Sequence, residues 1–416
     1  MDSLFDALGA NNKAMISIAI SQNGSPVYSR TTGYSRIEGA SKTAATEQTR
    51  YRIGSITKVF TGVMIFQLIE EGKIGLTTSL AKFFPGMPNA DKITIAHMLN
   101  HSSGLHNFTS DSTYLAVLDK KTSQAELLAK FKNAKPVFEP GAKHEYSNTN
   151  YVLLGYILEK LDKTNYAEAL KRRITGKIGL ANTYYGDGIH PEKKEADSYF
   201  WKDGWQPATE THMSIPGGAG ALVSTPSDLV RFMEALFSGK LVSEQSLAQM
   251  QKTEGAFGMA LFSYPFNDKT AYGHNGGIDG FQSQATYFPR EKVAIAYAAN
   301  GVNTQLNPVM IGVLSILFNV PYTIPSFKTA ELKSEDLDKL TGLYSSAQLP
   351  LKITISRKDG ALVAQATGQA AFTLEARSPS EFRFDPAGII LIFDAAKDEM
   401  LLKQGGQDFH FKRESR

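Results

Sequence analysis

The chain has 416 residues, enough for about two to three domains that each bury a core. Apolar residues make up 42% and charged residues 20%, which excludes a disordered chain, and a formal charge of +3 without a basic cluster argues against nucleic acid as a partner. There is no cysteine, so a disulfide, a thiolate nucleophile and a zinc site with Cys ligands are excluded.

The first part of the chain predicts an antiparallel hairpin followed by a helix. Residues 14–21 and 26–31 are rich in β-forming side chains, and the Asn-Gly pair between them is typical of a hairpin turn. From Ile56 to Glu71 apolar residues recur at helical spacing, and Gly72 stands where a helix C-cap would be. We therefore expect a helix with one buried face over this range.

The middle of the chain predicts a helical region and a second hairpin. Residues 80–180 have a mostly helical pattern, with a clear helix from Thr149 to Lys163. Residues 283–288 and 293–299 predict a hairpin whose strands would share one sheet with the first. Residues 309–320 are strongly apolar but shorter than the roughly 20 residues that a bilayer requires. They predict a core helix, and we expect no integral membrane segment.

The C-terminal part predicts a separate small domain. Two prolines within residues 321–325 mark a linker, with a boundary near residue 328. Short strand-like runs beyond it predict a small antiparallel β-barrel. The expected fold is therefore α+β, with an antiparallel sheet flanked by helices and a mostly helical lobe in residues 1–327, and a barrel domain in residues 328–416.

Ser55 and Lys58 form a Ser-x-x-Lys motif at the start of the predicted helix. A step of three residues places both side chains on one helix face, and the free N–H groups there would stabilise an alkoxide and an adjacent oxyanion. The lysine can take the hydroxyl proton only if its pKa falls well below about 10.4. The motif alone is weak evidence, because Ser79 and Lys82 match it too, and a capping serine beside a surface lysine is the commoner cause.

Two further motifs follow. An extended Tyr146-Ser147-Asn148 segment would point its Tyr and Asn the same way, so that a hydroxyl can relay a proton and an amide can hold a substrate amide. In residues 273–277, Gly-His-Asn-Gly-Gly, glycines at a strand start would let a substrate lie along the edge, with the Gly277 amide donating to an oxyanion. Taken singly, each is more often structural: a packed tyrosine with a capping asparagine, or a turn with a satisfied histidine.

In this order, the three motifs resemble those of the serine β-lactamase and penicillin-binding peptidase superfamily, nearest to its class C branch of D-Ala-D-Ala carboxypeptidases, D-aminopeptidases and esterases. Residues 97–105 and 217–229 also resemble family segments, and the likeness spans about residues 10–320. The C-terminal domain is similar to lipocalin-like barrels appended to some members. The resemblance implies a periplasmic or secreted protein, while residues 1–5 lack signal-peptide features and leave a cytoplasmic location open.

The resemblance implies a role for each motif residue. Ser55 would be the acylated nucleophile, with Lys58 and Tyr146 as its catalytic proton-transfer partners. The amides of Ser55 and Gly277 would form the oxyanion hole, and substrate would be bound by Asn148, His274, Asn275, Gly276 and Gly277. His274 stands where β-lactamases have a lysine that helps bind the substrate carboxylate. Peptides and esters are therefore expected ahead of β-lactams, with carboxylate binding lost as the histidine deprotonates near about pH 6.5.

The expected function is a serine hydrolase that cleaves amide or ester bonds through an acyl-Ser55 intermediate, chiefly in peptides with D-amino acids, without metal or cofactor. The expected partner is a small peptide, ester or β-lactam. One alternative is a penicillin-recognising binding or sensor protein that is acylated without efficient turnover, and another is an inactive interaction module. An α/β-hydrolase is disfavoured because no Gly-x-Ser-x-Gly occurs, and a metallohydrolase because no carboxylate lies between His97 and His101.

Overall fold

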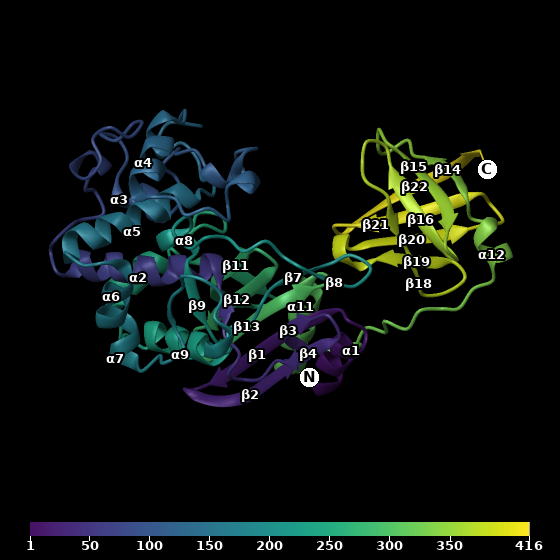
Figure 1. Cartoon of the computed structure of the whole chain (residues 1–416), viewed down its shortest axis with the longest axis horizontal. Coiled ribbons are helices and arrows are strands. Elements are labelled where there is room, and N and C mark those ends of the chain that lie inside the picture. Colours follow the sequence, from purple (N-terminus) through teal and green to yellow (C-terminus); the bar gives the residue numbers. More distant parts are fainter. Residues whose placement is uncertain (416) are drawn as a thin grey trace. The chain divides into compact units, whose positions relative to one another are not determined.

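The structure, a computed structural model, describes residues 1–415 and divides into two compact units (Figure 1). One unit is Met15–Gly301, and the other joins residues 1–14 to the chain from Val302 onward. The domain boundary near residue 328 stays a prediction.

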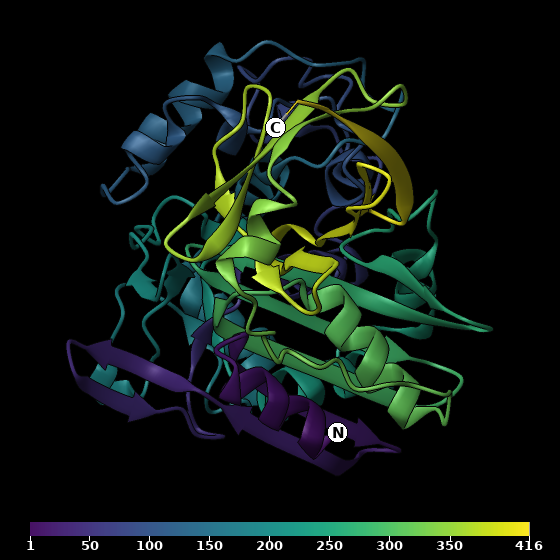
Figure 2. The same cartoon turned by 90° about the vertical axis from the view of Figure 1, so that its right-hand side faces the viewer.

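The Met15–Gly301 unit is built on a sheet that brings strands from its two ends together. Its main strand order is β10-β11-β12-β13-β1-β2, and the neighbouring strands within each hairpin run antiparallel. Both predicted hairpins are confirmed, and Figure 2 shows the purple N-terminal strands beside the green ones. The strands are β1 (Ala14–Gln22), β2 (Ser25–Thr32), β10 (Phe262–Phe266), β11 (Lys269–Ile278), β12 (Phe281–Phe288) and β13 (Val293–Val302).

Helix α2 (Thr57–Glu70) lies at the centre of this unit. Twelve of its fourteen residues are buried, whereas the spacing of its apolar residues predicts a single buried face. A helix that is buried all round needs partners on every side. These partners are α5 (Asn148–Asp162), α8 (Gly217–Gly220) and strand β11, which come from distant parts of the sequence. The N-terminus of α2 is thereby held between the sheet and the helices.

Residues 80–180 are mostly helical, as predicted, and Figure 1 shows their helices gathered to one side of the sheet. They comprise η2 (Leu80–Lys82), α3 (Ile95–Leu99), η3 (Phe108–Ser110), η4 (Tyr114–Ala116), α4 (Gln124–Asn133), α5, α6 (Tyr166–Leu170), the π-helical turn η5 (Lys171–Thr175) and α7 (Gly176–Ile178).

Short strands and two further helices complete the unit. Strand β9 pairs with both β5 and β6, and β7 pairs with β8 and β13. These elements are β3 (Tyr34–Glu38), β4 (Ser41–Ala44), β5 (Tyr51–Arg52), η1 (Gly54–Ile56), β6 (Tyr184–Tyr185), η6 (Pro191–Lys193), β7 (Tyr199–Trp201), β8 (Trp205–Pro207), β9 (Leu222–Ser224), α9 (Pro226–Phe237) and α10 (Glu244–Gln251).

The other unit contains a nine-stranded antiparallel sheet, in the order β17-β16-β15-β14-β22-β21-β20-β19-β18. Its strands curve around a buried apolar core into a near-closed barrel (Figure 2), which confirms the predicted β-barrel. The strands are β14 (Gly342–Ser345), β15 (Lys352–Lys358), β16 (Ala361–Ala366), β17 (Phe372–Thr373), β18 (Glu375–Ala376), β19 (Glu381–Phe384), β20 (Ile389–Asp394), β21 (Glu399–Gln404) and β22 (Gln407–Ser415).

Three α-helices and a 3-10 turn belong to the same unit as the barrel: α1 (Asp2–Ala10), α11 (Leu306–Leu317), α12 (Ser334–Asp338) and η7 (Asp385–Ala387). Helix α11 covers most of the predicted core helix. Within residues 1–415, no helix combines the length and the apolar character that a membrane crossing requires.

Candidate active site

Ser55 stands at the N-terminal start of α2. Strand β5 leads into the 3-10 turn η1, which contains Ser55, and α2 begins two residues later. Gly54 has a φ of +49°, in the left-handed region that favours glycine. The turn leaves Ser55 partly exposed while the following helix is buried, so the hydroxyl is accessible on a rigid support.

Lys58 lies one turn further on, as predicted, and is fully buried. Its Nζ is 2.8 Å from Ser55 Oγ, 2.8 Å from Asn148 Oδ1 and 2.7 Å from the carbonyl oxygen of Ala219. Burial lowers the pKa of the amine well below its usual value, because the charged form loses its hydration. A lowered pKa is what Lys58 needs if it is to take the proton of the Ser55 hydroxyl.

Tyr146 reaches the same hydroxyl from the segment that precedes α5. Its phenol donates a hydrogen bond of 2.7 Å to Ser55 Oγ, and its ring centroid lies 4.9 Å from Lys58 Nζ. Burial raises the pKa of Tyr146 above its usual value. The phenol therefore keeps its proton at neutral pH and acts as a donor.

Asn148 is the first residue of α5 and links two sides of the site. Its Oδ1 accepts from Lys58, and its Nδ2 donates to Thr109 Oγ1 at 3.0 Å.

Ser55, Asn148 and Gly277 all line one cavity of about 600 Å³. The cavity also has many apolar side chains: Phe108, Tyr114, Leu115, Leu118, Phe200, Pro216 and Ile278.

The glycine-rich motif lies at the end of β11, not at the strand start that the sequence predicts. β10 pairs with β11 as far as Gly273, and the rest of the motif pairs with β12. The glycines were expected to let a substrate backbone approach closely, but the backbone that approaches Gly276 is the protein's own. A Cβ on Gly276 would lie 2.0 Å from the carbonyl oxygen of Ile53. Gly277 lies beside Gly54, so the amide expected to donate to an oxyanion is next to the nucleophile segment.

His274 is placed differently from what a carboxylate-binding role requires. Its imidazole is 2% exposed, packs against Phe262 and Tyr146, and does not line the cavity around Ser55. Nδ1 contacts the carbonyl oxygen of Asn275 at 2.5 Å. Burial, with Lys58 nearby, lowers the pKa of His274 to about 3. The pKa of His274 therefore lies below the unperturbed value of about 6.5 on which the expected pH dependence rests.

Asn275 is also absent from the residues that line the cavity. Its side chain is exposed, and Tyr264 donates a hydrogen bond of 3.3 Å to its Oδ1. None of His274, Asn275 and Gly276 lines the cavity around Ser55. The substrate-binding roles expected for these three residues stay predictions.

Three residues outside the three motifs, His101, Thr109 and Ala219, contact motif residues at the site. The ring of His101 stacks on Tyr146 with 4.5 Å between centroids, and its Nδ1 accepts from the Ser147 amide. Thr109 holds Asn148, and the Ala219 carbonyl holds Lys58. The sequence signal for His101 and Ala219 was the resemblance of residues 97–105 and 217–229 to family segments.

The second Ser-x-x-Lys match is a helix cap, the structural alternative considered for such a motif. Ser79 Oγ accepts from the Ala81 amide at 3.1 Å and donates to the carbonyl oxygen of Ala90 at 2.7 Å. Lys82 is exposed. His97 likewise belongs to a capping box with Thr94, and in residues 1–415 no group of three potential metal-ligating side chains comes together.

The comparisons with known proteins agree with this arrangement. A family model described as Beta-lactamase matches residues 1–311. Penicillin-binding protein 4* of Bacillus subtilis is 25% identical over 98% of this chain and 97% of its own length.

Solved structures match about three quarters of the chain or nearly all of it. D-amino acid amidase from Ochrobactrum anthropi, complexed with D-phenylalanine, has a TM-score of 0.69 and is 26% identical, over 77% of this chain and 99% of that chain. The octameric penicillin-binding protein homologue from Pyrococcus abyssi has a TM-score of 0.69 at 23% identity, over 99% of this chain and 98% of that chain, and shows the shared fold. The family model, which covers most of the chain, shows that this protein belongs to the beta-lactamase family.

Proposed function

We propose that the protein hydrolyses amide or ester bonds through an acyl-Ser55 intermediate. The observation that carries the proposal is the hydrogen-bond chain at Ser55 Oγ, with Tyr146 at 2.7 Å and Lys58 at 2.8 Å. A neutral amine has two N–H groups, and Asn148 Oδ1 and the Ala219 carbonyl accept both. The lone pair of Nζ then faces Ser55, whose hydroxyl donates to it while accepting from Tyr146.

The pKa directions support distinct proton-transfer roles for Lys58 and Tyr146. Lys58, with its lowered pKa, takes the Ser55 proton as Oγ attacks the carbonyl carbon. Tyr146, with its raised pKa, stays a phenol that steadies Oγ by hydrogen bonding and passes a proton from Lys58 to the leaving group. The tetrahedral oxyanion accepts from the amides of Ser55 and Gly277. Water then attacks the acyl-enzyme with Lys58 again as the base, the bond between the acyl carbon and Oγ breaks, and the proton on Lys58 returns to Ser55 Oγ as the acid leaves.

The cavity favours substrates without a free carboxylate near the scissile bond. Among the described residues that line it there is no Lys, Arg or His, and its one charged side chain, Asp279, is paired with Arg52. A carboxylate placed here would lose hydration without gaining a cation. The apolar lining and the similarity to a D-amino acid amidase support amides or esters of apolar D-amino acids, ahead of carboxypeptidase substrates and penicillins.

The test is hydrolysis of a panel comprising D- and L-phenylalanine amide, a p-nitrophenyl ester, a peptide ending in D-Ala-D-Ala and benzylpenicillin. We expect turnover of the D-amide and the ester, lost in Ser55→Ala and kept in Ser79→Ala, the matched control at the second Ser-x-x-Lys site. Intact mass is recorded in parallel. Hydrolysis that persists in Ser55→Ala contradicts the proposal, and a stable penicillin adduct without turnover supports the binding-protein alternative.

A further inference from the structure

The segments that carry the two oxyanion donors meet through bare backbone. A Cβ on Gly54 would lie 2.8 Å from the carbonyl oxygen of Gly277, and the Ser283 hydroxyl donates to the carbonyl oxygen of Ile53 at 2.9 Å. Glycine backbones in contact have no side chains that interlock. Because oxyanion donors must stand about 2.7–3.1 Å from the oxygen, the spacing of the Ser55 and Gly277 amides depends on what braces this contact.

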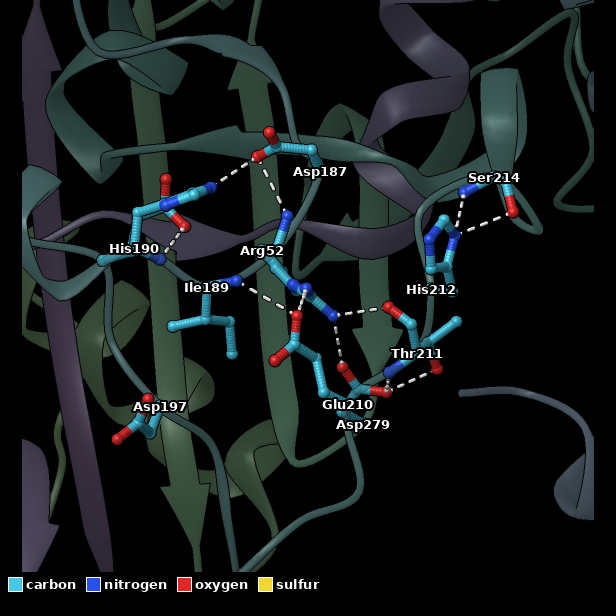
Figure 3. A network of polar contacts seen from close by, with 12 residues as sticks. Arg52, Asp187, Ile189, His190, Asp197, Glu210, Thr211, His212, Ser214 and Asp279 are labelled. Atoms are coloured by element: carbon cyan, nitrogen blue, oxygen red, sulfur yellow. Dashed lines mark hydrogen bonds and ion pairs between the residues drawn. The ribbon is translucent and has the colours of Figure 1, made fainter. Parts of the chain in front are cut away.

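A buried ion pair provides such a brace (Figure 3). Arg52 stands three residues before Ser55, and Asp279 stands two residues after Gly277. Arg52 Nη1 lies 2.9 Å from Asp279 Oδ2, and each side chain is 1% exposed. The pair therefore ties the strand that enters the nucleophile turn to the loop that leaves the oxyanion strand.

Thr211 completes the brace from a third segment. Arg52 Nη1 donates to its carbonyl oxygen at 2.8 Å, while its amide and hydroxyl donate to Asp279 Oδ1 at 3.0 and 2.5 Å. Arg52 Nη2 also bonds to Glu210. Each carboxylate oxygen of Asp279 thus has its own donors, as Figure 3 shows.

Asp279 is the first residue of the two-residue turn that joins β11 to β12. Its φ is +53°, a positive value that the first residue of such a hairpin turn normally takes and that Asp adopts more readily than most residues. Burial raises the pKa of Asp279, and the hydrogen bonds from Thr211 and the charge of Arg52 oppose that shift. The pair therefore anchors this turn to the strand that precedes Ser55.

We propose that Arg52 and Asp279 are positioning residues that set the spacing of the two oxyanion donors. They act through the backbone of Ser55 and Gly277 and hold no proton in the reaction. The inference rests on the proposed function, because this spacing matters only if an oxyanion forms there. Breaking the pair should slow acylation about tenfold to hundredfold, below the loss caused by removing an oxyanion donor outright.

The experiment compares p-nitrophenyl butyrate with its thiono analogue, in which sulfur replaces the carbonyl oxygen and accepts hydrogen bonds weakly. Wild type should acylate much faster with the ester. In Asp279→Asn and Arg52→Met the ester rate should fall tenfold to hundredfold while the thionoester rate stays nearly unchanged, so the ratio of the two drops by about the same factor. The ratio in Arg52→Lys should lie between those of Arg52→Met and wild type, because lysine keeps the positive charge but lacks the planar guanidinium group. A purely structural defect lowers both rates equally.

Arg173→Met is the matched control, because Arg173 forms a comparable buried cluster with Asp162 and Glu71 away from the cavity. It should lower Tm and leave the ratio unchanged. If Arg52→Met does not fold, the isosteric Asp279→Asn decides. An unchanged ratio of the ester rate to the thionoester rate in folded Asp279→Asn overturns the positioning role alone. Hydrolysis that persists in Ser55→Ala overturns the proposed function, and this inference with it.

Discussion

The neutral state of Lys58 makes stability depend on pH in a way that can be measured. Lys58 is fully buried with a lowered pKa, and the same residue in the unfolded chain has a pKa of about 10.4. Between these two pKa values the unfolded state holds one proton more than the folded state. Stability must therefore rise with pH across that window, by about 1.4 kcal/mol per pH unit for this single group.

The assay isolates Lys58 by difference. Urea unfolding is followed from pH 7 to pH 9 for wild type and Lys58→Met, because groups common to both proteins cancel in the difference. The free energy of unfolding of wild type relative to Lys58→Met should increase with pH over this range, by at most about 1.4 kcal/mol per pH unit. Lys82→Met, at the exposed lysine of the second Ser-x-x-Lys match, is the control and should give no such slope. Parallel curves for wild type and Lys58→Met would show that Lys58 is charged in the folded protein, which refutes its role as a base.

Three further outcomes test other parts of the account. Tyr146→Phe and Lys58→Ala should each slow acylation by orders of magnitude, with the double variant little worse than either, measured by stopped-flow release of p-nitrophenol; additive losses in log rate would mean that the two residues act separately. Because the pKa of His274 is lowered to about 3, kcat/KM should show no limb near pH 6.5 for either a peptide or an ester; a limb that disappears in His274→Gln would contradict the neutral assignment. Gly276→Ala should lower Tm and activity together, because its Cβ would meet the Ile53 carbonyl, whereas a Cβ on Gly75 would meet only Thr78 Oγ1 at 3.8 Å, so Gly75→Ala should leave activity unchanged.

Local sequence pattern was sufficient for the hairpins and for the helix after Ser55, whereas the residues around Ser55 were singled out by the resemblance of three ordered motifs to those of a family. Ser55, Lys58, Tyr146 and Asn148 belong to short motifs whose spacing already limits their geometry, and the structure brings all four together. The hairpins were predictable for the same reason, since their turns are local. These predictions needed no knowledge of tertiary packing.

What the sequence could not give depends on packing between distant segments. The burial of His274 arises from Phe262 and Tyr146, so a residue type that titrates near neutrality in water becomes neutral here. Arg52 and Asp279 are 227 positions apart, and no local pattern links them. Helix α2 is buried all round for the same reason, because its covering elements come from elsewhere in the chain.

Peptide mapping of the trapped enzyme shows whether Ser55 carries the acyl group. The protein is mixed with excess p-nitrophenyl butyrate, quenched in acid within the burst phase and digested for mass spectrometry. We expect one butyryl group on the peptide that contains Ser55, absent in Ser55→Ala and accumulating more slowly in Tyr146→Phe. A butyryl group on another residue, or a burst of p-nitrophenol in Ser55→Ala equal to that of wild type, would contradict this expectation.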